Sequence, residues 1–179
     1  MRVEELDYDL PPELIAQRPL EERDQSRLLV FDRSTGAVRH RRFEVVEVTL
    51  TVGLDTFRPV TEPSLADHRL HGERYAVSEG AWERIRSADR VVAVGTTTVR
   101  VLETLARGAP LSGRTELFVT PGFEFRRVDA LLTNFHLPRS TLLALVMAFA
   151  GVDETRRLYR TAIDERYRFY SFGDAMLIL

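Results

Sequence analysis

The sequence lacks both cysteine and lysine, and its 25 basic residues are all arginine. Without cysteine, disulfides, thiolate nucleophiles and cysteine-ligated zinc are excluded. Without lysine, Schiff-base catalysis and a P-loop are excluded, because both require a lysine amine. Arginine still offers a planar group that suits phosphate and carboxylate recognition.

Long apolar runs are also absent. The best candidate, from Leu142 to Ala150, is shorter than the roughly 20 residues that a membrane-spanning helix needs. Met1 is followed by Arg2 and Glu4 rather than by an apolar signal region. We therefore expect a cytoplasmic protein without membrane contact.

Charge of one sign is not in large excess, because the formal net charge is −2. A nucleic-acid surface would therefore have to be a local patch of arginines. The clustered arginines are Arg39, Arg41 and Arg42; Arg126 and Arg127; and Arg156, Arg157 and Arg160. Taken singly, each cluster is better explained as a solvated face than as a phosphate site.

Strand and helix patterns alternate along the 179 residues, and 44% of the residues are hydrophobic, which suffices for one packed domain. The predicted strands cover residues 27–32, 37–43, 45–52, 74–77, 91–94, 115–120, 125–133 and 175–179. The predicted helices cover residues 10–19, 78–88, 96–106, 140–150 and 153–165. This order predicts an α/β fold with a mixed sheet surrounded by helices, for which a barrel-like closure is one option.

The first motif is the turn at residues 94–100 (VGTTTVR), which follows a short apolar strand. Gly95 permits a tight turn, and the helix that follows offers free N–H groups beside three threonine hydroxyls. Such a turn can bind an anion or a ribose. The equally weighted alternative is that the threonines only cap the helix.

The second motif is residues 133–140 (TNFHLPRS), in which Pro138 restrains the loop. The Asn134, His136 and Arg139 side chains are expected beside the start of a buried helix, where a substrate could meet a rigid scaffold. On these residues alone, a capped helix with a structural histidine is the better explanation.

The third motif is His71-Gly72-Glu73, followed by Tyr75. A histidine and a carboxylate two residues apart on a strand share a face and can perform acid–base chemistry. His-x-Glu alone usually reflects surface polarity. His68 lies nearby, but no third residue has metal-ligand spacing, and we predict no metal.

The fourth motif is residues 166–174 (RYRFYSFGD), in which arginines alternate with aromatics. Base stacking and phosphate contacts use such residues. The competing explanation is a turn whose aromatic side chains fill the core, and composition alone favours that explanation.

Together, these segments resemble the family of queuosine ribosyltransferase-isomerases. The segments that carry the resemblance are 7–17 (DYDLPPELIAQ), 23–24, 26–29, 48–50, 56–60 (TFRPV), 94–100, 121–123, 133–141 and 167–176. Their order and length exclude a chance match. The family has a long middle segment with a small β-barrel domain, whereas here Phe43 runs directly into Glu44.

The resemblance therefore implies a single α/β domain over residues 1–179, formed by parts 1–43 and 44–179 that flank the missing insert. Three positions depart from the family pattern. They are Thr51 in place of histidine, Asp55 in place of glycine, and Gly72 in place of alanine or a small hydroxyl residue.

The resemblance also implies an activity. The family transfers the ribosyl moiety of S-adenosylmethionine to 7-aminomethyl-7-deazaguanine in tRNA and isomerises it, giving epoxyqueuosine with release of adenine and methionine. S-adenosylmethionine is then a consumed substrate, no other cofactor is expected, and the partners are S-adenosylmethionine and tRNA carrying the modified wobble guanine. We expect a monomer.

The expected catalytic residues are His71, Glu73 and His136. His71 is the better candidate for the base, because its neutral imidazole is available near pH 7, with Glu73 orienting it. His136 would lie across the pocket, positioning the substrate or transferring a proton. The expected substrate-binding residues are Arg58, Thr96, Thr97, Thr98, Arg100, Asn134, Arg139, Arg168 and Tyr170. An equally weighted alternative is that the three catalytic candidates only hold loops together.

Two other functions remain open from the sequence. One is a catalytically inactive, tRNA-binding remnant of the family, as the missing segment and the three departures indicate. The other is a generic α/β nucleotide-binding domain, supported only by the Gly-Thr-Thr-Thr turn.

Overall fold

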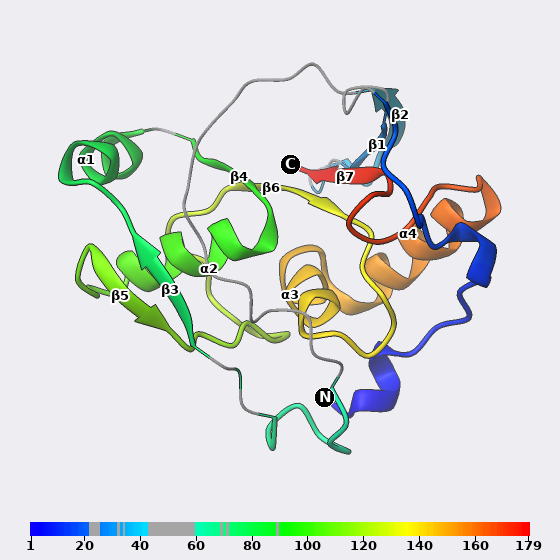
Figure 1. Ribbon diagram of the computed structural model, residues 1–179, viewed down its shortest axis with the longest axis horizontal. Coiled ribbons are helices and arrows are strands. Elements are labelled where there is room, and N and C mark those ends of the chain that lie inside the picture. Colours follow the sequence, from blue (N-terminus) through cyan, green and yellow to red (C-terminus); the bar gives the residue numbers. More distant parts are fainter. Residues whose placement is uncertain are drawn as a thin grey trace.

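The computed structural model describes residues 1–21, 26–31, 33, 35–42, 60–68, 70, 72–88 and 90–179. Its centre is a five-stranded mixed sheet in the order β2-β1-β7-β6-β4 (Figure 1). The strands are β1 (Arg27–Phe31), β2 (Val38–Arg42), β4 (Val92–Val94), β6 (Ala130–Asn134) and β7 (Ala175–Ile178). β1 runs antiparallel to β2 and parallel to β7, while β6 runs antiparallel to β7 and parallel to β4.

Most of the long helices gather on one side of this sheet (Figure 1). The long helices are α1 (Glu79–Ser87), α2 (Thr96–Leu105), α3 (Thr141–Ala150) and α4 (Val152–Asp164). In Figure 1, α2, α3 and α4 lie side by side along the sheet, and the two-stranded antiparallel sheet of β3 (Glu73–Ala76) and β5 (Ser112–Thr115) lies beyond α2 with α1. The N-terminal segment, with short 3-10 helices at Val3–Leu6 and Pro12–Leu14, runs past α3 and α4.

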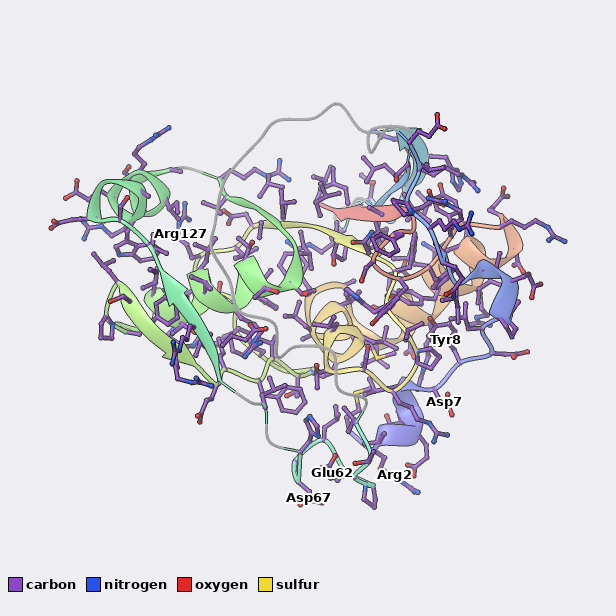
Figure 2. All side chains as sticks on the ribbon, in the orientation of Figure 1. Arg2, Asp7, Tyr8, Glu62, Asp67 and Arg127 are labelled. Atoms are coloured by element: carbon purple, nitrogen blue, oxygen red, sulfur yellow. The ribbon has the colours of Figure 1, made fainter. Side chains whose placement is uncertain are left out.

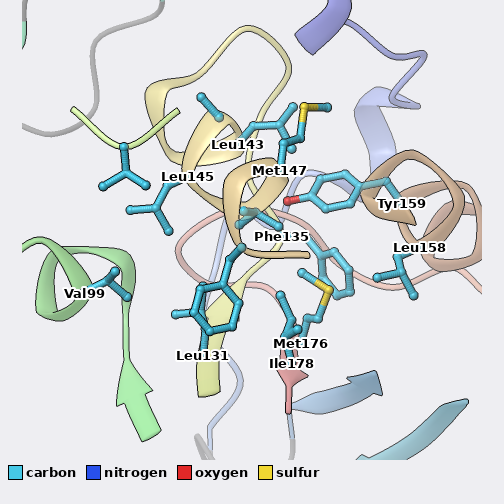
Figure 3. Packing of buried hydrophobic residues seen from close by; sticks show 14 of the residues in the cluster. Val99, Leu131, Phe135, Leu143, Leu145, Met147, Leu158, Tyr159, Met176 and Ile178 are labelled. Carbon is cyan, nitrogen blue, oxygen red and sulfur yellow. The ribbon is translucent and has the colours of Figure 1, made fainter. Parts of the chain in front are cut away.

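The core lies between the five-stranded sheet and the helices (Figure 3). Because side chains alternate across a strand, every second residue of β1, β6 and β7 faces the helices. The buried apolar side chains of this face are Leu29, Phe31, Leu131, Met176 and Ile178. Burying each such side chain stabilises the fold by roughly 1.5–3 kcal/mol, because its apolar surface is removed from water.

Helix α3 is apolar on all sides because it lies between the sheet, α2 and α4, and eight of its residues are buried. The Ser140 hydroxyl accepts a hydrogen bond from the Leu143 N–H at 3.1 Å and caps its start. Gly151, with φ of 92°, ends α3 and begins α4. These boundaries confirm the prediction.

Three predicted elements are wrong or displaced. The helix expected from residue 10 is only the 3-10 turn Pro12–Leu14, because Ile15 leaves it to form a β-bridge with Phe169. The strand expected at 115–120 lies instead at Ser112–Thr115, where β3 supplies its partner. Residues 126–128 are not strand, because their N–H groups all donate to the buried Glu103 carboxylate at 2.9–3.1 Å.

The mixed α/β prediction is confirmed, but the described sheet is open rather than a closed barrel. β2 and β4 form its two edges. Val92 and Val94 of β4 are 48% and 56% exposed, so the described residues leave one face of this apolar strand largely uncovered. The strand predicted at 45–52 lies outside the described residues, and no described helix is long and apolar enough to span a bilayer.

Candidate functional site

Several predicted motifs meet at the border of the five-stranded sheet where β4 and β6 end. We call this border the sheet edge, as distinct from the outer strands β2 and β4. β4 and β6 are parallel, so both end at this edge, and antiparallel β7 begins there opposite Asn134. β1 begins beside β7 at the same edge. Open α/β sheets bind ligands outside the carboxyl ends of their parallel strands. The edge therefore places the 95–100 turn, the 134–139 loop and the 168–174 turn near each other.

The 95–100 turn is anchored to β6 by the Gly95 N–H, which donates to the Leu132 carbonyl at 2.8 Å. Gly95 has φ of 86°, which a glycine adopts without strain. Thr96 is buried and Thr97 is half-buried, while the Thr98 hydroxyl donates to the Val94 carbonyl at 2.7 Å. No described side chain caps the start of α2, so threonine capping does not explain this turn.

The 168–174 turn is organised by Asp174, the last residue of the fourth motif, which is not among the expected site residues. Its buried carboxylate accepts hydrogen bonds from the Arg27 N–H at 2.8 Å and the Arg168 N–H at 2.7 Å. The Asn134 side-chain amide donates to the Asp174 carbonyl at 3.0 Å. Asn134 and Arg168 are therefore brought together around Asp174. The signal in the sequence was a carboxylate directly before an apolar strand.

The aromatics of this turn divide into two groups. Tyr167 and Phe169 are fully buried, as the core-filling explanation expects, whereas Tyr170 is half-buried and Phe172 is 45% exposed. Tyr170 has φ of 73°, held by its N–H bond to the Phe135 carbonyl at 2.9 Å. Positive φ is costly for a tyrosine, so the surrounding contacts fix its position. The Arg168 guanidinium donates to the Phe172 carbonyl at 2.8 Å.

His136 is buried within the 134–139 loop. The ring Nε2 atom of His136 lies 2.9 Å from the Thr133 hydroxyl, and the backbone N–H of His136 donates to the Tyr159 hydroxyl at 3.1 Å. The Tyr8 hydroxyl donates to the backbone carbonyl of His136 at 2.6 Å. Burial lowers the pKa of the His136 imidazole to about 3, because the charged form would lose its hydration. The ring is thus neutral at pH 7 and a weak base.

Arg139 follows in the same loop, with φ of 55°. Its guanidinium forms an ion pair with Asp7, with the Nε atom 3.0 Å from the carboxylate. Figure 2 shows Asp7 and Tyr8 in the N-terminal segment that passes this loop. Residues at the start of the chain therefore hold the loop from two sides.

Glu73 and Arg100 form a separate, buried ion pair with a separation of 2.7 Å. The Arg100 guanidinium also donates to the carbonyls of Leu117 at 2.9 Å and Thr115 at 3.2 Å. Burial lowers the pKa of Arg100, and the Glu73 carboxylate opposes that shift. This pair ties α2 to β3 and β5.

The structure does not bring Glu73 next to His136. β3 lies on the opposite side of α2 from the β6–α3 connection that carries His136 (Figure 1). His71 and Arg58 lie outside the described residues. The described catalytic candidates therefore occupy two places, the Glu73–Arg100 pair and the 134–139 loop.

Three arginines of the predicted clusters, Arg127, Arg156 and Arg157, bond within the protein. The Arg127 guanidinium donates to the Ile85 carbonyl at 2.8 Å, and Figure 2 shows it beside α1. Arg156 donates to the Glu5 carbonyl at 2.9 Å, and Arg157 bonds to Glu154 on its own helix. These contacts favour the solvated or structural explanation for the clusters at 126–127 and 156–157.

Comparison with known proteins gives consistent matches. A family profile described as a queuosine biosynthesis protein matches residues 3–47 and 41–178. A protein named S-adenosylmethionine:tRNA ribosyltransferase-isomerase from Rubrobacter xylanophilus is 61% identical over 135 residues, which cover 75% of this chain and 40% of that protein. A protein of the same name from Natranaerobius thermophilus is 54% identical over 143 residues, covering 75% and 42%.

A solved structure also matches. The S-adenosylmethionine tRNA ribosyltransferase from Thermotoga maritima is similar with a TM-score of 0.77 and 33% identity, covering 98% of this chain and 100% of that one. The chain spans about two fifths of the length of the curated relatives.

Proposed function

Because the chain belongs to the queuosine biosynthesis protein family, as its motifs predicted, we propose that it acts on S-adenosylmethionine and tRNA. In this reaction the ribosyl moiety of S-adenosylmethionine is joined to the 7-aminomethyl-7-deazaguanine of tRNA and isomerised to give epoxyqueuosine. Adenine and methionine are released, and the reaction takes place in the cytoplasm. The convergence of the 95–100, 134–139 and 168–174 segments at one sheet edge carries the proposal.

The sheet edge supplies what substrate binding requires. The start of α2 offers N–H groups and the Thr97 hydroxyl to a phosphate or a ribose. Arg168 and Tyr170 lie on the neighbouring turn, where a guanidinium and a phenol ring suit a nucleotide. Replacing Thr97 and Thr98 by valine should weaken substrate binding while the melting temperature stays close to that of the parent protein. Unchanged affinity for both substrates would remove this turn from the site.

Within this proposal His136 is a positioning residue. An imidazole with a pKa of about 3 removes protons poorly at pH 7, and its ring and backbone are held by Thr133, Tyr159 and Tyr8. His71 remains the proposed base. A His71→Gln protein should lose roughly 10²-fold or more in turnover at little cost in stability. Near-normal turnover would show that His71 is not the base.

The tRNA contact is assigned to Arg168. If arginines neutralise phosphates, tRNA affinity should fall steeply as salt rises, because counterions are released on binding. An Arg168→Ala protein should bind tRNA more weakly and with a smaller salt slope. Arg157→Ala is the matched control, because Arg157 is already bonded to Glu154 on α4. Equal effects of the two substitutions would contradict the assignment.

A tRNA-binding protein without turnover is the second candidate, because the chain spans only about two fifths of its relatives' length. The two are separated by incubating the chain with S-adenosylmethionine and tRNA that carries 7-aminomethyl-7-deazaguanine, and measuring free adenine by chromatography. Adenine release with this tRNA, but not with tRNA that carries guanine, supports the enzyme. Retention of tRNA without adenine release supports the binding protein.

A further inference from the structure

A pocket of about 320 Å³ lies where the N-terminal segment passes over α3 and α4. Asp7, Tyr8 and Asp9 form one wall, and α3 and α4 form the others. Small-molecule sites usually have volumes of roughly 300–1,000 Å³, so this pocket suits a small ligand or one end of a larger one. The wall comes from the DYDLPPEL segment, whose Asp7 and Tyr8 also hold the 134–139 loop through Arg139 and His136.

The floor of this pocket is apolar and uncharged. Leu143 and Met147 of α3 and Ile163 of α4 contribute aliphatic and thioether surface. Figure 3 shows Tyr159 extending from α4 toward α3, near Met147. The hydroxyls of Tyr8 and Tyr159 are bonded to the backbone of His136, and burial raises both phenol pKa values, so both rings stay neutral.

The rim of the pocket carries two carboxylates and two guanidinium groups, and one of each already has a partner. Asp7 is paired with Arg139, and Arg156 is bonded to the Glu5 carbonyl and lies 3.5 Å from Asp153. In the part of the chain that the structure describes, neither Asp9 nor Arg160 forms an ion pair, and both are exposed. The Arg160 Nε atom donates to the Arg156 carbonyl at 3.4 Å on its own helix. The Asp9 carboxylate and the terminal nitrogens of the Arg160 guanidinium are therefore the groups that can meet a ligand at the mouth of this apolar pocket.

We infer that this pocket binds the amino-acid end of S-adenosylmethionine, an inference that rests on the proposed function. The Asp9 carboxylate would accept hydrogen bonds from the α-ammonium group, and the Arg160 guanidinium would donate to the α-carboxylate. The methylene chain and sulfur would lie on the apolar floor, and the tyrosine ring faces can accept a sulfonium cation. Adenine carries no charge and would leave both rim groups without a partner.

The pocket is joined to the sheet-edge site through shared side chains. Tyr8 and Tyr159 line the pocket and also hold the backbone of His136. Asp7 lines the pocket and is paired with Arg139 of the same loop. A ligand whose methionine end occupies the pocket would thus lie beside the 134–139 loop.

The inference is tested by calorimetry on the full chain, with L-methionine and S-adenosylmethionine as separate ligands. Asp9→Asn and Arg160→Gln should each weaken the binding of both ligands by about tenfold or more, the effect of losing one charge-assisted hydrogen bond. The matched controls are Asp164→Asn and Arg157→Gln, which change exposed residues of α4 that do not line the pocket. Thermal melting checks that all four variants are folded.

The outcomes separate this inference from the proposed function. If S-adenosylmethionine binds and the four variants bind it equally well, the pocket assignment is wrong while the proposed function stands. If adenosine, but not L-methionine, competes with S-adenosylmethionine, the pocket does not bind the amino-acid end. Methionine binding that depends on Asp9 and Arg160, without adenine release in the tRNA assay, supports the pocket and not the enzyme. The absence of binding of either ligand up to about 1 mM would overturn the pocket assignment.

Discussion

The buried His136 should make the stability of this protein depend on pH below neutrality. In the unfolded chain its imidazole has the ordinary pKa of 6.5, and in the folded protein burial lowers the pKa to about 3. Between these values the unfolded chain binds a proton that the folded protein does not. The free energy of unfolding therefore falls as pH falls from about 6.5 to about 3, and this contribution is constant outside that window.

The size of the effect follows from the shift. One pKa unit corresponds to about 1.36 kcal/mol, and pH 5 lies about 1.5 units below the unfolded pKa. His136 should therefore lower the free energy of unfolding by about 2 kcal/mol between pH 7 and pH 5, which is roughly a 30-fold change in the unfolding equilibrium.

The assay compares the parent protein with His136→Gln by urea unfolding at pH 7 and pH 5. Other titrating groups are common to both proteins and cancel in the difference. Glutamine can still bond to Thr133, whose hydroxyl lies 2.9 Å from the His136 Nε2. The destabilisation that the substitution causes at pH 7 should shrink by about 2 kcal/mol at pH 5, because the variant no longer loses this contribution.

The ionisation of the His136 imidazole can also be measured directly, without reference to stability. Nitrogen-15 spectra of the imidazole rings should show that His136 stays neutral down to about pH 4, with the other histidines in the same spectra for comparison. If His136 titrates near pH 6.5, or if the destabilisation is equal at both pH values, the ring is not buried as described. Its role as a neutral positioning residue would then fail as well.

Two further predictions concern stability. Arg100→Gln should lower the free energy of unfolding by about 3–5 kcal/mol in urea, because it leaves the Glu73 carboxylate in a buried site without its guanidinium partner. A double variant with Arg100→Met and Glu73→Leu should cost clearly less than the sum of the single changes, and additive costs would contradict a coupled pair. Gly173→Ala should cost at least about 2 kcal/mol, because its Cβ would lie 2.3 Å from the Arg168 carbonyl oxygen. Gly80→Ala in α1, where a Cβ meets open space, is the control and should be neutral or stabilising in the same urea assay. Equal stability of the two alanine variants would argue against the close approach at Gly173.

The sequence by itself determined the elements whose signals are local. The helices predicted to start at residues 78 and 140 are capped by Ser78 and Ser140, whose hydroxyls accept hydrogen bonds, and Gly95 and Gly151 begin α2 and α4. The hairpin of β1 and β2 and the final strand β7 also lie where alternating or apolar runs placed them. Caps, turns and periodic apolar residues act over a few positions, so they can be recognised without knowledge of the fold.

Local signals predicted the wrong element where a contact with a residue distant in sequence determines the conformation. A helix was expected at residues 10–19, but Ile15 pairs with Phe169 across the molecule. A strand was expected at residues 125–133, but the N–H groups of residues 126–128 donate to the carboxylate of Glu103 instead of to a neighbouring strand. In both cases a contact distant in sequence outweighs the local preference.

Only the tertiary structure decided which motif residues meet. Asp174 bonds to Arg27 across 147 positions, and Tyr8 bonds to His136 across 128. Such pairs depend on strand order and register, which no short pattern contains. The sequence therefore indicated His136 and Arg168 as candidate functional residues. Only the fold showed that the His136 ring is neutral and its backbone held by two tyrosines, and that the Arg168 backbone is bonded to a buried carboxylate.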